Sequence, residues 1–325
     1  MIELMVAMLL GLLVIGGVVS VFLANQQSYR TNQALGDVED SSRTAFELMA
    51  RDIRNAGLDG CDNSGRVSNV LKNSPAGGGT DWWANWNNAL VGYGTGTALA
   101  DPAITTATGA VTQVASTDSL MLIGGDSMGL SMLSDAEPAA TFTLNETTSN
   151  LHAGDVAIAC DPDHAAITQI TSYAGGPPIT FGHVASSGSP GNCTTDLSYP
   201  TVCSSSSSYV FPANSQITKL TAADWYLGNV PGGGTALYRI VLVNTAGVPT
   251  PTAYEMVPGV TSMSIAYLPS GGTAFVAASA ITNWATVDAV QVTWTLQSTD
   301  QRAGTDVKPI TRKFTATTTV RNRVN

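Results

Sequence analysis

The sequence predicts an α+β protein in which one long N-terminal α-helix packs on an antiparallel β-sheet with long, disulfide-stapled loops. Three observations predict this fold. An apolar run opens the chain and continues, without a proline, into an amphipathic helical pattern that ends near Gly57. Beyond it, short runs alternate apolar and polar residues, and four cysteines lie among them. We expect three parts: a membrane-spanning half-helix over 1–24, an amphipathic half over 25–57, and a β-rich globular domain over 58–325.

The apolar run contains twenty-one uncharged, mostly apolar residues from Leu4 to Ala24. At about 1.5 Å per residue it spans the roughly 30 Å hydrocarbon core of a bilayer, so it predicts a membrane helix. One acidic residue, Glu3, stands directly before it. Because a carboxylate costs about 2.5–3.5 kcal/mol at the bilayer centre, we expect Glu3 to have a specific partner.

Two simpler interpretations of the apolar run compete with this one. A secretory signal peptide needs a basic start and a small-residue cleavage site, but no Lys or Arg precedes Arg30 and residues 22–24 read Phe-Leu-Ala. A plain membrane anchor explains the length and composition of the run. It leaves Glu3 without a role.

The segment after the apolar run predicts the second half of the same helix. Two acid-first pairs at i,i+4 are expected on its polar face, Glu39 with Arg43 and Glu47 with Arg51. The opposite face carries one apolar stripe at three-, four- or seven-residue spacing, formed by Leu35, Val38, Ala45, Met49, Ile53 and Ala56. The complete helix exceeds what a bilayer requires, so its second half must dock on the globular domain or on neighbouring copies.

Glycines mark the places where this helix is weakest. Gly16, Gly17 and Gly36 each cost up to about 1 kcal/mol relative to alanine, and we expect the helix to bend or melt there. Gly57 and Gly60 are the expected terminators.

The rest of the chain predicts β-strands joined by Gly-, Ser- and Pro-rich loops. Val290, Val292, Trp294 and Leu296 alternate with polar residues, which indicates a half-buried strand. The segment 310–320 predicts a second strand antiparallel to it. Shorter strands are expected at 119–123, 156–160, 166–171, 238–243 and 263–267. Loops are expected at 77–79, 175–178, 204–208 and 232–234.

The composition favours an exported protein that does not bind nucleic acid. Only 12% of the residues are charged, and the net charge is −10. Nucleic-acid binding needs clustered Lys and Arg. Because Arg312 and Lys313 fall on opposite faces of a strand, we interpret the one basic cluster as solvated strand edges, with DNA contact as the weaker alternative. That cluster holds six of the fourteen basic residues: Arg302, Lys308, Arg312, Lys313, Arg321 and Arg323.

Four cysteines are an even number, which in an exported chain favours disulfides over free thiols. Four cysteines permit three pairings. The short separation of Cys193 and Cys203, in polar Gly/Pro/Ser-rich surroundings, favours a local bond between them and leaves Cys61 with Cys160. Zinc binding is the alternative, but the chain has no C-x-x-C pair and its histidines lack ligand spacing. We expect the segment 161–164, Asp-Pro-Asp-His, to form a turn rather than half of a metal loop.

No catalytic motif is present in the sequence, which contains no G-x-S-x-G, H-E-x-x-H, P-loop or helix-opening G-x-G-x-x-G. We therefore expect no enzyme activity, no cofactor, no metal and no small-molecule substrate. The aromatic group Trp82, Trp83 and Trp86 is the one candidate ligand-binding site, because exposed indoles stack on sugars. Packing in the core or under loops is the favoured interpretation of these side chains.

Three segments resemble a known family. The start, Met-Ile-Glu-Leu-Met-Val-Ala-Met at 1–8, resembles that of type IV pilins, whose processed chains begin Phe-Thr-Leu-Ile-Glu-Leu two residues earlier and have Leu at the position of Met1. The segment 49–61, Met-Ala-Arg-Asp-Ile-Arg-Asn-Ala-Gly-Leu-Asp-Gly-Cys, is similar to the segment that closes the helix in PilW-type minor pilins. The segments 287–292 and 320–323, the latter Val-Arg-Asn-Arg, resemble the last strands of that family.

The resemblance implies a pilin-like fold and a minor pilin that takes part in type IV pilus assembly, at initiation or in a tip complex. The helix would cross the inner membrane once, with the domain in the periplasm, and later pack against other minor pilins and the major pilin in the extracellular filament. Glu3 would neutralise the N-terminal ammonium of a neighbouring subunit. The alternatives are a pilus-tip adhesin that binds a surface or glycan, a type II secretion minor pseudopilin of the J type, and an anchored periplasmic enzyme.

Overall fold

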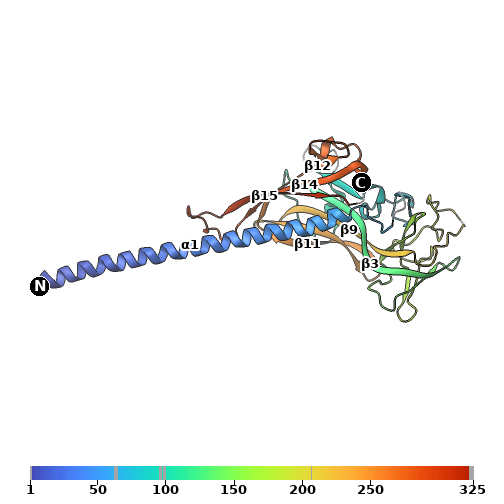
Figure 1. Cartoon of the computed structure of the whole chain (residues 1–325), viewed down its shortest axis with the longest axis horizontal. Coiled ribbons are helices and arrows are strands. Elements are labelled where there is room, and N and C mark those ends of the chain that lie inside the picture. Colours follow the sequence, from blue (N-terminus) through green and yellow to red (C-terminus); the bar gives the residue numbers. More distant parts are fainter. Residues whose placement is uncertain (1, 62–64, 95–96, 98–99, 206, 322–325) are drawn as a thin grey trace.

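The chain consists of one long helix that projects from a β-rich domain (Figure 1). The computed structural model describes residues 2–61, 65–94, 97, 100–205 and 207–321. Met1 of the N-terminal motif, and Asn322 and Arg323 of the C-terminal one, lie outside the described residues. A long helix, a largely antiparallel sheet and two disulfides confirm the predicted α+β class.

Helix α1 (Ile2–Asn55) is one helix of 54 residues. It does not melt at Gly16, Gly17 or Gly36, because glycine keeps the backbone hydrogen bonds of a helix and each cost is only about 1 kcal/mol. The helix ends before Gly57, as expected, and Gly57 has a φ of +73°, the left-handed conformation common after a helix.

The end of α1 passes directly onto strand β3 (Ser119–Ala136). Gly57 N donates to Ile123 O at 2.8 Å, and Ala56 forms an antiparallel bridge with Gly124. This approach requires glycine at position 124, because a Cβ there would lie 1.9 Å from Asn55 O. The helix terminus is therefore fixed to the sheet by backbone contacts.

The larger sheet has eleven strands. Its main path runs β1-β6-β5-β9-β3-β4-β8-β7, with β10 and β11 extending from β9 and β2 pairing with β3. The pairs are antiparallel except β1 with β6. Besides β3, the strands are β1 (Val67–Asn69), β2 (Leu90–Tyr93), β4 (Thr141–Leu144), β5 (Val156–Cys160), β6 (Ala165–Gln169), β7 (Ser172–Ala174), β8 (Thr180–Gly182), β9 (Gln216–Asn229), β10 (Thr235–Thr245) and β11 (Val248–Pro258).

The smaller sheet has four strands in the order β13-β12-β14-β15. Their bounds are β12 (Val260–Pro269), β13 (Val276–Ala277), β14 (Val287–Gln297) and β15 (Thr311–Thr319). The expected antiparallel pair of the last two strands is confirmed, with Trp294 opposite Phe314. The short helices are α2 (Pro102–Thr106), η1 (Trp82–Ala84), η2 (Trp86–Asn88), η3 (Ala278–Ala280) and η4 (Trp284–Thr286).

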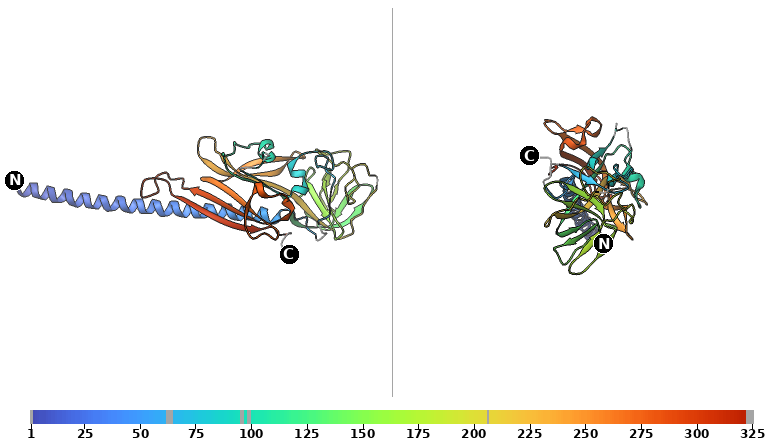
Figure 2. Two further views of the ribbon diagram at one scale, coloured as in Figure 1. Left: turned by 90° about the horizontal axis from the view of Figure 1, so that it is seen from above. Right: turned by 90° about the vertical axis from the view of Figure 1, so that its right-hand side faces the viewer.

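The main core lies where the second half of α1 meets both sheets (Figure 2). Met49 and Ile53 of the helix pack there with Trp225 and Leu237 of the larger sheet and Trp294 of the smaller one. A second core lies between the larger sheet and the short helices η1 and α2. A third core surrounds β4 and the C-terminal part of β3. We call this part of the domain, which lies farthest from the N-terminus of α1, its distal end (Figure 1).

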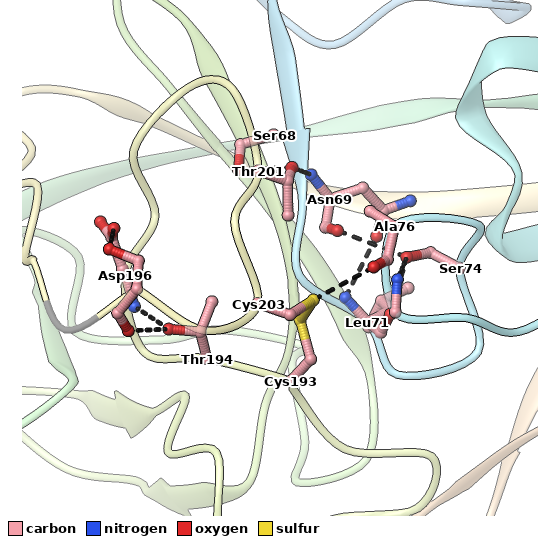
Figure 3. Close-up of a disulfide and its surroundings, with 12 residues drawn as sticks. Ser68, Asn69, Leu71, Ser74, Ala76, Cys193, Thr194, Asp196, Thr201 and Cys203 are labelled. Atoms are coloured by element: carbon pink, nitrogen blue, oxygen red, sulfur yellow. Dashed lines mark hydrogen bonds between the residues drawn. A yellow bond between two sulfur atoms is a disulfide. The ribbon is translucent and has the colours of Figure 1, made fainter.

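Both disulfides have the expected pairing. Cys61, just after α1, bonds to Cys160 at the end of β5 across a sequence separation of 99 residues. Cys193 bonds to Cys203 across 10 residues. Figure 3 shows that Cys203 faces the loop after β1, where its Sγ lies 3.3 Å from Ala76 O, and that Thr201 Oγ1 accepts a hydrogen bond from Asn69 N at 2.8 Å. The first bond fixes the end of the helix, and the second fixes a surface loop.

Candidate functional site

The first half of α1 is an exposed apolar rod. Every described residue from Ile2 to Gln26 is exposed, and large side chains such as Leu9 and Phe22 are both 62% exposed. The helix is long and apolar enough to cross a membrane, and its most apolar stretch buries nothing within the chain. Soluble monomers rarely expose an apolar surface of this extent, so this half of the helix requires lipid or other chains around it.

Glu3 lies in the first turn of this rod, at the tip farthest from the domain (Figure 1). Its side chain is exposed. A carboxylate in the first turn of a helix is stabilised by the positive end of the helix dipole, by about 0.3–1 kcal/mol. The domain is too far away to supply a partner, because the first contact of α1 with it is at Gln27. A cationic partner for Glu3 would therefore have to come from another molecule.

The loop between β14 and β15 makes the first contact between the domain and the rod (Figure 2). Gln27 Nε2 donates to the carbonyl oxygens of Arg302, Ala303 and Gly304 at 3.1, 3.1 and 2.9 Å. Thr31 Oγ1 donates to Ala303 O at 2.5 Å. This loop contacts polar side chains of α1. It marks the border between the exposed and the docked half of the helix.

An apolar stripe docks the second half of α1. The expected positions Val38, Ala45, Met49, Ile53 and Ala56 are buried, while Leu35 is half-buried. Sequence reasoning missed a polar member of the stripe, Ser42, whose Oγ accepts a hydrogen bond from Trp294 Nε1 at 3.2 Å. A polar residue occupies this core position because its partner is supplied by a distant strand.

Asp52 fixes the base of the helix to the larger sheet. Its two carboxylate oxygens accept from Arg239 Nε and Nη2, both at 2.8 Å, and Oδ2 also accepts from Trp225 Nε1 at 2.8 Å. Arg239 and Trp225 are opposite each other on β10 and β9, and the guanidinium lies 5.6 Å from the indole ring centroid. Bidentate geometry sets direction as well as strength, so this contact holds α1 in one orientation.

The expected charge pairs on the helix surface form differently. Arg43 pairs with Glu47 at 3.0 Å, and Arg51 pairs with Asp126 of β3 at 3.8 Å. The predicted pairs, Glu39 with Arg43 and Glu47 with Arg51, were therefore wrong, because each arginine has a different partner. Exposed pairs contribute only about 0–1 kcal/mol each, so a nearby alternative carboxylate is enough to change the pairing.

The aromatic group at 82–86 does not form an exposed binding surface. Trp82 and Trp83 of η1 are 5% and 3% exposed and belong to the second core, while Trp86 is half-buried against it. The favoured interpretation, packing, agrees with this placement. The adhesin alternative required indoles that a ligand could reach, and two of the three lie inside the domain.

The predicted turn forms between two buried residues, Asp161 and His164, and the basic cluster lies at the surface of the domain. Asp161 Oδ1 accepts from Asp163 N at 2.8 Å and His164 N at 3.0 Å, which is the turn expected at 161–164. In the basic cluster, Arg323 lies outside the described residues. The five members that the structure describes are exposed on the β14–β15 loop, on β15 and just after it.

A buried carboxyl pair lies beside α2. Asp101 caps this helix through Ala103 N at 2.9 Å, and Ser119 Oγ donates to its other oxygen. Asp224 of β9 is fully buried beside it, and the two carboxyl groups can share a hydrogen bond only when one of them holds a proton. Burial, and then the charge of Asp101, raise the pKa of Asp224 well above its ordinary value of 3.8.

We expect Asp224→Asn to remove a pH-dependent loss of stability. Because folding raises this pKa, the proton stabilises the fold fully below pH 3.8, and that contribution is lost as the pH rises through the folded value. The variant should therefore match wild type at about pH 4 and exceed it by about 1–3 kcal/mol at about pH 8. Urea unfolding of the full chain in detergent, monitored by tryptophan fluorescence, measures this difference.

The control for this experiment is Asp40→Asn, an exposed carboxylate on α1. It should follow the wild-type curve at every pH. Parallel curves for wild type and Asp224→Asn would show that the buried carboxyl does not hold its proton in the folded state.

No protein-family model matches the sequence, and no curated protein matches it. The class of the protein is therefore defined by its architecture. A 54-residue helix, apolar and exposed in its first half, continues into a β-sheet domain that holds its second half and contains two disulfides. The chain has a pilin-like architecture.

Proposed function

We propose that this chain is a PilW-like minor pilin, a structural subunit that helps to start or cap a type IV pilus. One observation carries the proposal: the same unbroken helix is exposed and apolar over its first half and fixed to a β-sheet domain over its second. A signal peptide would be removed and needs no docked second half. A plain anchor needs no rigid connection to its domain.

The two halves of α1 suit the two environments that such a subunit would occupy. In the inner membrane the exposed half faces lipid, with the domain in the periplasm. In the filament the same surface faces helices of other minor pilins and of the major pilin. Because Asp52 and the buried stripe hold the domain in one orientation, packing of the helices would also set where the domain lies.

Glu3 gives this proposal its chemical specificity. In a bundle of apolar helices, a carboxylate is costly unless a cation pairs with it. The N-terminal ammonium of a neighbouring subunit is such a cation, and it lies at the same end of the same kind of helix. The structure of the single chain leaves Glu3 exposed and available for this pairing.

Labelling with an antibody against the domain tests the proposed place of the protein. We expect gold label at the tips of sheared pili as well as in inner-membrane fractions, because the subunit moves from membrane to filament. Label confined to the membrane, together with a secretion defect in the deletion strain, would instead support a type II secretion pseudopilin. The deletion strain complemented with the chain lacking residues 2–24 is the control for specific incorporation.

A further inference from the structure

Three side chains with metal-binding atoms meet at the distal end of the domain. Asp135 and Glu137 lie where β3 ends, and His183 directly follows β8. The intervening strand β4 brings them together, because Asp135 is opposite Phe142 on β4 and Phe142 is opposite Phe181 on β8. One ligand atom from each of the three residues lies within 4.8 Å of the other two.

Five polar atoms of these side chains are buried without the hydrogen bonds that burial normally requires. The side chains of His183 and Glu137 are 0% and 2% exposed. Among the described residues, five of their atoms have no hydrogen-bond partner: both ring nitrogens of His183, both carboxylate oxygens of Glu137 and Oδ1 of Asp135. Since native proteins satisfy most buried polar atoms, five such atoms in one place indicate a missing ligand.

The separation of His183 and Glu137 fits two ligands of one bound ion. His183 Nε2 and Glu137 Oε1 lie 3.1 Å apart, yet their geometry is not that of a hydrogen bond. Two ligands each about 2.0–2.2 Å from the same ion stand about 3.0–3.5 Å apart at octahedral to tetrahedral angles. One imidazole and two carboxylates suit a transition ion such as Zn²⁺ or Mn²⁺. Ca²⁺ is a poorer fit, because it takes six to eight oxygen ligands.

We propose that Asp135, Glu137 and His183 form a structural site for a divalent transition-metal ion, with Zn²⁺ the best-fitting candidate. The ion would link the end of β3 to the end of β8. Asp135 extends this link to a third segment, because its Oδ2 accepts a hydrogen bond from Phe211 N at 2.8 Å.

The surroundings of the site support this assignment. The His183 ring packs on Phe142, with 4.5 Å between ring centroids and a tilt of 30°. Phe142 also contacts Phe211 edge-on, so aromatic rings shield the site from water. Asp135 is partly exposed, which leaves a side from which an ion can enter.

The competing explanation is a buried Glu137–His183 ion pair that needs no metal. Metal titration of the full chain in detergent, after removal of metals with a chelator, separates the two. We expect one equivalent of Zn²⁺ to bind, and the melting temperature to rise by about 5–10 °C at 100 times the dissociation constant. Mn²⁺ and Ca²⁺ are titrated in parallel, and calorimetry gives the stoichiometry.

Two variants locate the ion. His183→Gln and Glu137→Gln each keep a side chain of similar size and should weaken Zn²⁺ binding at least about 100-fold and abolish the thermal shift. Glu137→Gln decides the matter if His183→Gln does not fold. His152→Ala removes a histidine that is 73% exposed and should bind as wild type does.

Three outcomes would overturn the assignment. Absence of binding and of a thermal shift with both Zn²⁺ and Mn²⁺ would leave the ion pair as the explanation. Binding that persists in the Glu137→Gln variant would place the ion elsewhere. Binding of Ca²⁺ in preference to Zn²⁺ would show that the ion class is wrong.

Discussion

Glu3→Ala is expected to reduce the number of pili per cell at least about tenfold while the domain stays folded. Under the proposed function, Glu3 pairs with an ammonium of another subunit among apolar helices. Breaking a buried pair costs about 3–5 kcal/mol, and each 1.4 kcal/mol is a factor of ten in an equilibrium. Pilus counts by electron microscopy, at protein levels matched by immunoblot, measure the effect.

Two further variants make this test specific. Glu3→Gln keeps the size of the side chain and removes the charge, so it should be as defective as Glu3→Ala. Glu39→Ala removes another exposed carboxylate of α1 and should assemble normally. Wild-type pilus numbers with Glu3→Gln would show that the charge of Glu3 has no role in assembly.

Asp52→Ala is expected to lower the free energy of unfolding by about 3 kcal/mol. The substitution leaves Arg239 and the Trp225 indole N–H without their shared acceptor in a largely buried place, where the side chains of Asp52 and Arg239 are 13% and 29% exposed. Removing one partner of such a pair is costly because the remaining charge is uncompensated. Urea unfolding of the full chain in detergent gives the value.

A matched surface pair serves as the control. Asp126→Ala breaks the contact with Arg51. Because the side chains of Asp126 and Arg51 are 48% and 70% exposed, this variant should lower the free energy of unfolding by less than about 1 kcal/mol. Asp52→Ala combined with Arg239→Met should recover part of the loss, because it removes the unpaired charge. If Asp52→Ala costs no more than Asp126→Ala, the ion pair does not hold the base of the helix.

The placement of α1 relative to the domain connects these results. About twenty residues of apolar helix would be enough to anchor a domain in a membrane, at about 1.5 Å per residue. The chain instead continues the helix to Asn55 and fixes its base by backbone contacts with β3, a partly buried ion pair and the Cys61–Cys160 bond. This construction favours a subunit whose helix packing must determine the position of its domain.

The sequence alone determined the elements whose signals are local. The apolar run and the stripe at 35–56 follow from helical periodicity, which depends only on neighbouring turns of the same helix. The alternation in β14 predicted a strand with one buried face, and its burial alternates along most of its length. The disulfide pairing also followed from sequence, because a ten-residue separation favours one local bond and leaves a single second pair.

Two long strands escaped prediction for physical reasons. β9 is buried along most of its length on both faces, so its residues do not alternate between apolar and polar. β11 contains Pro249 and Pro251, which argue against a strand inside a sheet. The structure places β11 at an edge: among the described strands it pairs with β10, and on its other side Thr108 makes a single bridge to Thr252, so proline is tolerated.

The contacts between distant parts of the chain could not be predicted from local patterns. Asp52 meets Arg239 across 187 residues, and no local pattern in the sequence pairs these two residues. In the same way, Asp135 and Glu137 are ordinary acidic residues at the end of a strand until strand pairing brings His183 to them. Local patterns determine which elements form, because their energetics lie within a few residues. The register between strands determines which side chains share a site, and that register is set by packing of the whole domain.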